Sequence, residues 1–280
     1  MEVLVIGATG RNSGMVVPEL KQRGVSVRAL VRDSSRVSAA RRAGSDTTVV
    51  GDLADPASLR AATEGVDGVF HVNPAFAPDE AQMGVAMVAA AKAAGVRKFV
   101  FSGVYHPTVS AMVNHSAKQP VEEALYESGM DFTILQPAMF MQNLAGLWDT
   151  AVRTGRLTMP YSKHARVCYV DYRDVAEAAA LALTGDRLSY GTFELAAPGM
   201  VDRIDIAALM STAIGGTVEA DESAPQAARS GAGAMERGLA RMTAHYDEYG
   251  FPGGNGLVLE AILGREPLSL SHFFTEMAAG

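Results

Sequence analysis

The chain has 280 residues, a net charge of −7 and one cysteine, Cys168. The acidic balance, without any basic block, argues against nucleic acid as a partner. A single cysteine excludes an intrachain disulfide and a thiolate metal cluster, and no group of His, Asp and Glu has the spacing of metal ligands. We expect no signal peptide and no membrane-spanning segment, and therefore a cytoplasmic protein without a membrane partner.

The functional prediction depends on an apolar run at residues 3–6 and the turn that follows it. The turn reads Gly7-Ala8-Thr9-Gly10-Arg11-Asn12-Ser13-Gly14, and a segment with helical character comes next. A buried strand, a glycine-rich turn and a helix together aim backbone N–H groups and the helix dipole at a phosphate. The spacing is one residue longer than the usual short-chain dehydrogenase form, so either Ser13 or Gly14 takes the place of the third glycine.

A second apolar run, at residues 25–31, ends at Arg32. In dinucleotide folds, an acidic residue here accepts from the 2′-hydroxyl of NAD, whereas an arginine pairs with the 2′-phosphate of NADP. Asp33 and Arg36 follow, and Arg11 lies in the glycine turn, so the charge balance favours NADP(H) over NAD(H). The alternative is that the arginines are solvated and Asp33 holds the ribose.

Four more apolar runs follow, at residues 47–50, 68–72, 98–101 and 132–135, and helical segments alternate with them. This alternation predicts right-handed crossovers and therefore an α/β fold with a doubly wound parallel Rossmann sheet. We expect residues 1–155 to form the dinucleotide-binding domain. Residues 156–280 would form a smaller, mostly helical C-terminal substrate lobe, with residues from about 166 to 198 returning to the sheet.

Several residues with functional potential follow the predicted strands closely. Ligands of parallel sheets bind beyond the carboxyl ends of the strands, which places Asn73, Pro74, Ser102 and Tyr105 near the cofactor. Asp52 has a similar position, and it either accepts from the adenine amino group or serves as a turn residue.

Lys118 stands just before a predicted helix, because Pro120 suits the first helical position. The helix dipole disfavours a cation at this end, so we expect a ribose hydroxyl, a phosphate or a substrate oxygen to compensate it. A surface lysine is the alternative. At the start of a later helix, Asp171 and Asp174 look catalytic in isolation, but N-capping explains both of them.

Five motifs occur in one order along the chain: Gly7-Ala8-Thr9-Gly10, Leu30-Val31-Arg32-Asp33, Gly51-Asp52-Leu53, Ser128-Gly129-Met130-Asp131-Phe132-Thr133-Ile134-Leu135-Gln136-Pro137 and Val170-Asp171-Tyr172-Arg173-Asp174-Val175-Ala176. Together they resemble the NmrA-like branch of the atypical short-chain dehydrogenases, over most of the chain. The resemblance implies a Rossmann fold and an NAD(P) cofactor. It does not fix the reaction, because that branch includes quinone and ketone reductases, isoflavone-reductase-like enzymes and regulators that bind the dinucleotide without turning it over.

The resemblance also implies that Lys118 lies near the nicotinamide ribose. The cofactor contacts that we predict are Gly7, Thr9, Gly10, Arg11, Asn12, Gly14, Arg32, Asp52, Asn73, Pro74, Ser102, Lys118 and Pro137.

The usual proton donor of short-chain dehydrogenases is a tyrosine four residues before the lysine, and here Asn114 stands in that place. His115, Tyr105 and Ser102 are substitute donors, and a histidine of near-neutral pKa suits general acid catalysis. The alternative for His115 is a solvated or hydrogen-bonded loop side chain. Catalysis is therefore predicted for Lys118, with His115 or Tyr105 as the donor.

Residues 138–144 are apolar, and in the resembling family this stretch forms one wall of the substrate pocket. Flexible methionines and aromatic rings suit a planar apolar ligand. Core packing is the alternative for any one of these residues. The substrate contacts that we predict are Met139, Phe140, Met141, Asn143 and Trp148.

Two functional hypotheses follow. The first is an NADPH-dependent oxidoreductase that transfers hydride to a small apolar quinone, enone or ketone, without the usual tyrosine. The second is a non-catalytic regulator that binds NADP(H) and senses redox state through a protein partner. The sequence leaves the oligomeric state open, a homo-oligomer included.

Overall fold

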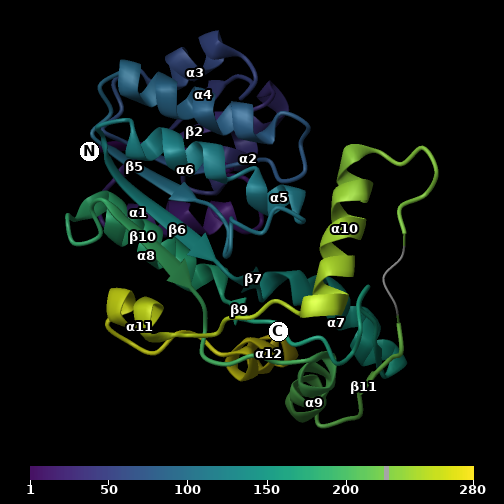
Figure 1. Cartoon of the computed structure of the whole chain (residues 1–280). Coiled ribbons are helices and arrows are strands. Elements are labelled where there is room, and N and C mark those ends of the chain that lie inside the picture. The colour runs from purple at the N-terminus through teal and green to yellow at the C-terminus, as the bar shows by residue number, and fades with distance from the viewer. Residues whose placement is uncertain (224–226) are drawn as a thin grey trace. The chain divides into compact units, whose positions relative to one another are not determined.

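The computed structural model describes residues 1–223 and 227–280, which group into two compact units (Figure 1). The first unit contains Met1–Thr108, His115–Gln136 and Val175–Phe193. The second unit contains Val109–Asn114, Pro137–Asp174 and the described part of Glu194–Gly280. The chain passes between the units several times, and each unit is described by itself.

A seven-stranded sheet with the strand order β10-β6-β5-β4-β1-β2-β3 forms the centre of the first unit. The pairs β1–β2, β1–β4, β2–β3, β4–β5 and β5–β6 are all parallel. This order confirms the predicted doubly wound Rossmann sheet. The strands are β1 (Glu2–Ile6), β2 (Ser26–Val31), β3 (Thr47–Val50), β4 (Gly68–Val72), β5 (Lys98–Ser102), β6 (Asp131–Pro137) and β10 (Gly191–Leu195).

Helices cover both faces of this sheet, with α3, α4 and α6 side by side on one face and α1 and α8 on the other (Figure 1). The helices are α1 (Val16–Gln22), α2 (Val37–Arg42), α3 (Pro56–Thr63), α4 (Glu80–Ala93), α5 (Val113–Ser116), α6 (Gln119–Tyr126) and α8 (Tyr172–Thr184). Two 3-10 turns, Ser13–Met15 and Ser34–Arg36, precede α1 and α2.

The local sequence explains why these elements form. Val3, Leu4 and Val5 are fully buried, as the continuous apolar run predicted for a strand covered on both faces. Asp55 accepts hydrogen bonds from the backbone N–H groups that open α3, and Pro56 occupies its first position. The strands of parallel sheets end at one edge, so the turns after β1, β2 and β4 lie close together there.

The second unit is mostly helical and contains two short parallel strand pairs, β7 with β9 and β8 with β11. Trp148 stacks on Phe274 with ring centroids 5.7 Å apart, which joins α7 to α12. Its elements are β7 (Met139–Phe140), α7 (Gln142–Thr154), β8 (Arg156–Leu157), β9 (Tyr169–Val170), α9 (Arg203–Ile214), β11 (Glu219–Ala220), α10 (Ala234–Tyr249), α11 (Leu257–Leu263) and α12 (Leu270–Ala279).

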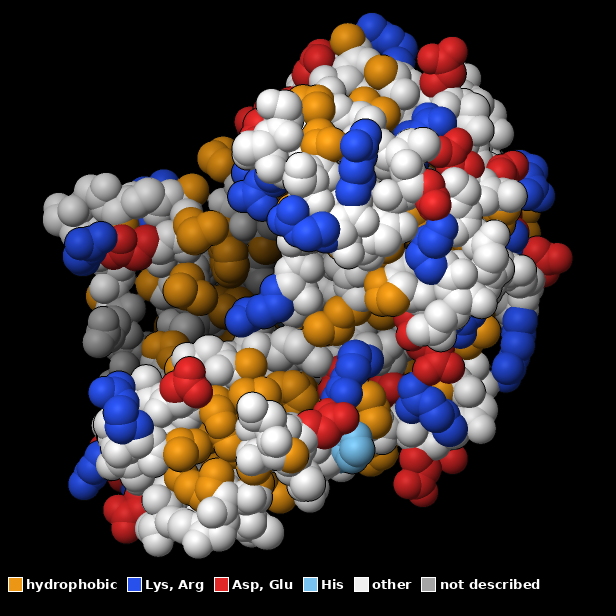
Figure 2. Space-filling view, turned by 180° about the vertical axis from the view of Figure 1, so that it is seen from behind, with side chains coloured by type: hydrophobic (Ala, Val, Ile, Leu, Met, Phe, Trp, Pro, Cys, Tyr) orange, Lys and Arg blue, Asp and Glu red, His pale blue; other side chains and the backbone are white. Residues whose placement is uncertain are grey.

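Acidic and basic side chains are interspersed on the face of the molecule seen in Figure 2. Among the helices that the structure describes, none combines the length and the apolar character needed to cross a bilayer.

Candidate functional site

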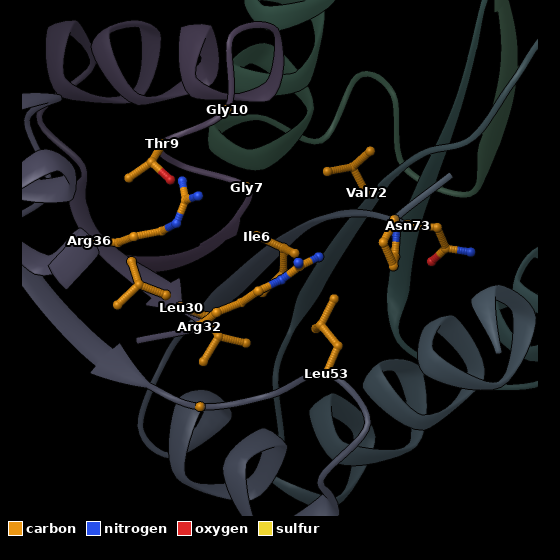
Figure 3. A pocket seen from close by; sticks show the side chains of 13 residues that line it. Ile6, Gly7, Thr9, Gly10, Leu30, Arg32, Arg36, Leu53, Val72 and Asn73 are labelled. Atoms are coloured by element: carbon orange, nitrogen blue, oxygen red, sulfur yellow. The ribbon is translucent and has the colours of Figure 1, made fainter. Parts of the chain in front are cut away.

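A pocket of about 340 Å³ opens at the carboxyl ends of β1, β2 and β4 in the first unit (Figure 3). The turns after these strands supply most of its walls. The lining residues are Ile6, Gly7, Thr9, Gly10, Leu30, Val31, Arg32, Arg36, Gly51, Leu53, Val72, Asn73 and Pro74. This is the edge of the sheet at which the sequence predicted ligand binding.

The glycine turn is closed by its own backbone. Gly10 N–H donates to the carbonyl of Gly7 at 2.7 Å, and the Ser13 hydroxyl donates to the same carbonyl at 2.8 Å. Gly7 has a φ of +79°, which favours glycine. A Cβ on Gly14 would lie 2.9 Å from the carbonyl oxygen of Ala8. Gly14 therefore has the close-packing role of the third glycine, and Ser13 fastens the turn.

Two arginines enter the pocket at the end of β2. Arg32 and Arg36 both line it, and Figure 3 shows the Arg36 side chain directed toward Thr9 of the glycine turn. Asp33 is held elsewhere, because its carboxylate accepts from the backbone N–H of Ser35 at 2.9 Å and from the Ser35 hydroxyl. The Ser35 hydroxyl is the main cause that lowers the pKa of Asp33. The other carboxylate oxygen of Asp33 lies 4.0 Å from Nε of Arg36, so two guanidinium groups line this end of the pocket and one of them has an acidic neighbour.

The remaining cofactor residues that the sequence predicted differ in their surroundings. Asn73 is buried, its Oδ1 lies 2.7 Å from His71 Nε2, and its Nδ2 has no hydrogen-bond partner among the described residues. Asn12 Oδ1 is likewise buried and unpartnered within the described chain. Asp52 is exposed and accepts from Ala54 N–H at 2.9 Å. Of the two alternatives for Asp52, an adenine contact and a turn residue, this hydrogen bond is the one expected of a turn residue.

Arg11 is exposed on the glycine turn, and Pro137 is buried at the end of β6. Ser102, at the end of β5, is 1 % exposed.

Lys118 is buried at the N-terminus of α6, and its ammonium forms an ion pair with Glu80 of α4. Burial lowers the pKa of Lys118, and the charge of Glu80 opposes this shift. The sequence predicted a ribose hydroxyl, a phosphate or a substrate oxygen as the group that compensates the lysine, and each of these stays a prediction. It did not identify Glu80, which supplies a negative charge from within the protein. An acidic residue in the first turn of a predicted helix is a common feature, so the sequence contained no specific signal for this partner.

The proposed proton donors are also buried. His115 is 1 % exposed, and burial, aided by the charge of Lys118, lowers its pKa to about 4. Its ring is therefore neutral at pH 7, with Nδ1 lying 3.3 Å from the carbonyl of His106. Tyr105 is 3 % exposed and packs edge-on against His106, with ring centroids 4.2 Å apart. Catalysis by either residue stays a prediction.

The predicted substrate residues all lie in the second unit. Met139 and Phe140 are half-buried in β7, and Asn143 is exposed in the first turn of α7. Met141 is fully buried and borders a second pocket, of about 450 Å³, within this unit. Trp148 is 7 % exposed in the stack with Phe274, so packing accounts for its position. Their role as a substrate wall stays a prediction.

No cluster of His, Cys, Asp and Glu that could hold a metal ion occurs in the part of the chain that the structure describes.

The pocket combines a parallel sheet edge, a glycine turn that excludes side chains, and two guanidinium groups. These features define the class of Rossmann-type dinucleotide-binding proteins.

Comparison with known proteins gives the family. The NmrA-like family model matches residues 1–278, and the chain belongs to this family. An NAD(P)H azoreductase of Xenophilus azovorans is 36 % identical over 215 residues, which cover 76 % of this chain and 74 % of that protein. A (4-alkanoyl-5-oxo-2,5-dihydrofuran-3-yl)methyl phosphate reductase of Streptomyces griseus is 32 % identical over 232 residues, covering 81 % and 79 %. A photosystem II assembly factor, Ycf39 of Synechocystis, is 28 % identical over 69 % of this chain and 61 % of its own length.

The solved structures agree on the fold. The NADPH-dependent quinone oxidoreductase QOR2 of Escherichia coli, complexed with NADPH, superimposes with a TM-score of 0.84 at 21 % identity and covers 99 % of both chains. The triphenylmethane reductase of Citrobacter, complexed with NADP(H), has a TM-score of 0.83 at 21 % identity and covers 99 % of this chain and 100 % of its own.

Proposed function

We propose that this protein is an NADPH-dependent reductase that delivers hydride to a small apolar acceptor. The observation that carries the proposal is the pair of guanidinium groups, Arg32 and Arg36, beside the glycine turn in one pocket. The azoreductase and the phosphate reductase among the relatives support the reaction class. The two structural neighbours complexed with NADPH or NADP(H) have the same fold.

The residues of the pocket fit this cofactor. Gly14 packs closely on the Ala8 carbonyl, which leaves no room for a Cβ between the turn and the helix that follows, and the backbone N–H groups of the turn would face a pyrophosphate. Arg32 and Arg36 would pair with the 2′-phosphate, and the engaged Asp33 would not compete for the ribose. The unpartnered Nδ2 of Asn73 would donate to an oxygen of the nucleotide.

When bound, NADPH supplies the hydride, and the acceptor takes one proton from another source. Asn114 cannot act as the usual tyrosine does, and the neutral His115 is a weak acid at pH 7. A quinone needs little help from a protein acid, because water can protonate the reduced oxygen. We therefore place quinones first among the acceptors, followed by enones and ketones, and Lys118 would orient the ribose or polarise the substrate oxygen.

The test is NADPH oxidation by the purified full chain with a panel of quinones, enones, ketones and azo compounds. We expect steady turnover with some quinones. We expect Lys118→Ala to lower the rate by about tenfold. Lys92→Ala is the matched control, because Lys92 is an exposed lysine on α4 and its loss should leave the rate unchanged. No turnover across the panel would refute the enzyme.

Asn114 in the tyrosine position favours a second function, a regulator that binds NADP(H) without turning it over. Tight nucleotide binding without turnover, together with a protein partner recovered in only one redox state, would support the regulator instead of the reductase.

A further inference from the structure

Glu80 and Lys118 form a buried ion pair, and neither residue is among those that line the pocket at the glycine turn. Glu80 is 2 % exposed and Lys118 5 % exposed, and they come from α4 and from the residue that precedes α6. Burying two charges is costly, and an apolar pair of similar volume often serves stability as well. The pair therefore needs a reason beyond the packing of two helices.

Glu80 also holds the loop that leads away from the pocket. Its second carboxylate oxygen accepts from the backbone N–H of Phe76 at 2.8 Å. Phe76 has a φ of +64°, a left-handed conformation that residues other than glycine rarely adopt. Two turns connect this loop to the pocket wall, because Ala77 N–H donates to Pro74 at 3.1 Å and Glu80 N–H donates to Ala77 at 3.2 Å. One carboxylate thus joins Lys118 to the loop that begins at the pocket.

We propose that Glu80 is a positioning residue, which keeps the Lys118 ammonium charged and fixed relative to the loop after β4, so that Lys118 can contact the bound dinucleotide or its acceptor. The proposal rests on the function proposed above for Lys118. Glu80 itself does not line the pocket and acts through the lysine.

The electrostatics of the cluster agree with this geometry. In the described part of the chain, the titratable groups that interact electrostatically with Lys118 include Glu80 of α4, His71 of β4 and His115 of α5. Burial lowers the pKa of each histidine to about 4, so both rings are neutral at pH 7. Burial also lowers the pKa of Lys118, and the Glu80 carboxylate raises it. Removing that charge should therefore lower the pKa of Lys118 further.

The decisive variant is Glu80→Gln, which keeps an oxygen for Phe76 N–H and removes the charge. We expect kcat to fall about tenfold at pH 7, and we expect the fall of kcat with rising pH to begin at a lower pH in the variant than in the wild type. The affinity for NADPH should show the same loss with rising pH.

The kcat of Glu80→Gln should fall as pH rises, whereas the stability of the same variant without nucleotide should increase. The pKa of folded Lys118 lies below its unfolded value, so the unfolded chain binds more protons between the two values and stability increases with pH. The Tm deficit of Glu80→Gln should therefore be largest near pH 6 and smaller near pH 9. A purely structural role would make activity follow stability at every pH.

Three further variants complete the test. Glu80→Asp retains a carboxylate and should keep the wild-type pH profile. The double variant Glu80→Gln with Lys118→Ala should be no slower than Lys118→Ala alone, because Glu80 acts through Lys118. Asp131→Asn is the matched control: it breaks the Lys98–Asp131 pair of 2.7 Å at the start of β5, away from the pocket edge. It should lower Tm and leave the pH profile unchanged.

The proposal is overturned if Glu80→Gln keeps the wild-type pH dependence, or if the double variant shows the product of the two single losses. If the wild type binds NADPH without turnover, the reductase proposal fails, and the pH dependence of NADPH affinity still decides the role of Glu80. If no nucleotide binds, both proposals fall.

Discussion

Arg32 gives the sharpest test of cofactor recognition. In the proposed complex its guanidinium pairs with the 2′-phosphate of NADPH, a group that NADH lacks. Arg32→Ala should therefore weaken NADPH binding and leave NADH binding nearly unchanged. The nearby Asp33 does not offset this effect, because it is held by Ser35.

The size of the effect follows from the exposure of Arg32. A hydrogen bond to a charged group contributes about 1.5–3 kcal/mol. Arg32 is exposed, so solvent and salt reduce this to about 1–2 kcal/mol. Since about 1.4 kcal/mol corresponds to a tenfold change, the Kd for NADPH should rise roughly 5- to 30-fold. Arg36 would keep part of the phosphate contact, which prevents a larger loss.

Calorimetric titration of the wild type and of Arg32→Ala with NADPH and NADH measures both constants directly. Arg41→Ala is the matched control, since it removes the same charge from the last turn of α2, away from the pocket wall. An equal loss of affinity for NADPH and NADH in Arg32→Ala would refute the reasoning, because Arg32 would then support the pocket and not the additional phosphate.

Three other predictions concern the pocket turns and the cysteine. Gly14→Ala should raise the Kd for NADPH more than about tenfold, because its Cβ would press on the Ala8 carbonyl 2.9 Å away; an unchanged Kd in calorimetry would contradict this. Ser35→Ala removes the hydroxyl that holds Asp33 but keeps the backbone N–H at this position, so it should loosen Asp33 and reduce the ratio of NADH to NADPH dissociation constants by roughly 2-fold; a ratio that stays constant would show that the hydroxyl does not keep Asp33 from the ribose. Burial raises the pKa of Cys168 to about 12, so a thiol reagent at pH 8 should modify the native protein slowly and the unfolded chain rapidly; rapid modification of the native protein would indicate an accessible thiolate.

The sequence predicted the sheet well because local patterns determine it. The apolar runs that became β1 and β4 are buried on both faces, and the helices between them enforce parallel pairing. The glycine turn was equally readable, since only glycine fits the φ of Gly7 and the contact at Gly14.

Partners that meet only in the folded chain were not predictable. Lys118 required compensation, but Glu80 lies 38 residues earlier and reaches it because α4 packs against α6. Asp174 was predicted to cap a helix, and that prediction was wrong: it is fully buried and accepts from Arg265 at 2.8 Å and from Leu268 N–H at 2.7 Å. Asp171 does accept from Arg173 N–H at 2.9 Å, as an N-cap would.

The two groups of cations in the first unit differ in the physics that governs them. Arg32 and Arg36 are exposed, so salt and solvent weaken their electrostatic interactions. In the proposed complex these interactions distinguish NADPH from NADH. Lys118 is buried, where a charge interacts strongly with its neighbours but is costly to maintain. A lysine that orients a ribose or polarises a substrate oxygen acts as a cation, and a carboxylate beside it favours the charged form. Glu80 supplies this carboxylate without entering the pocket, so the exposed arginines can select the cofactor independently of the buried pair.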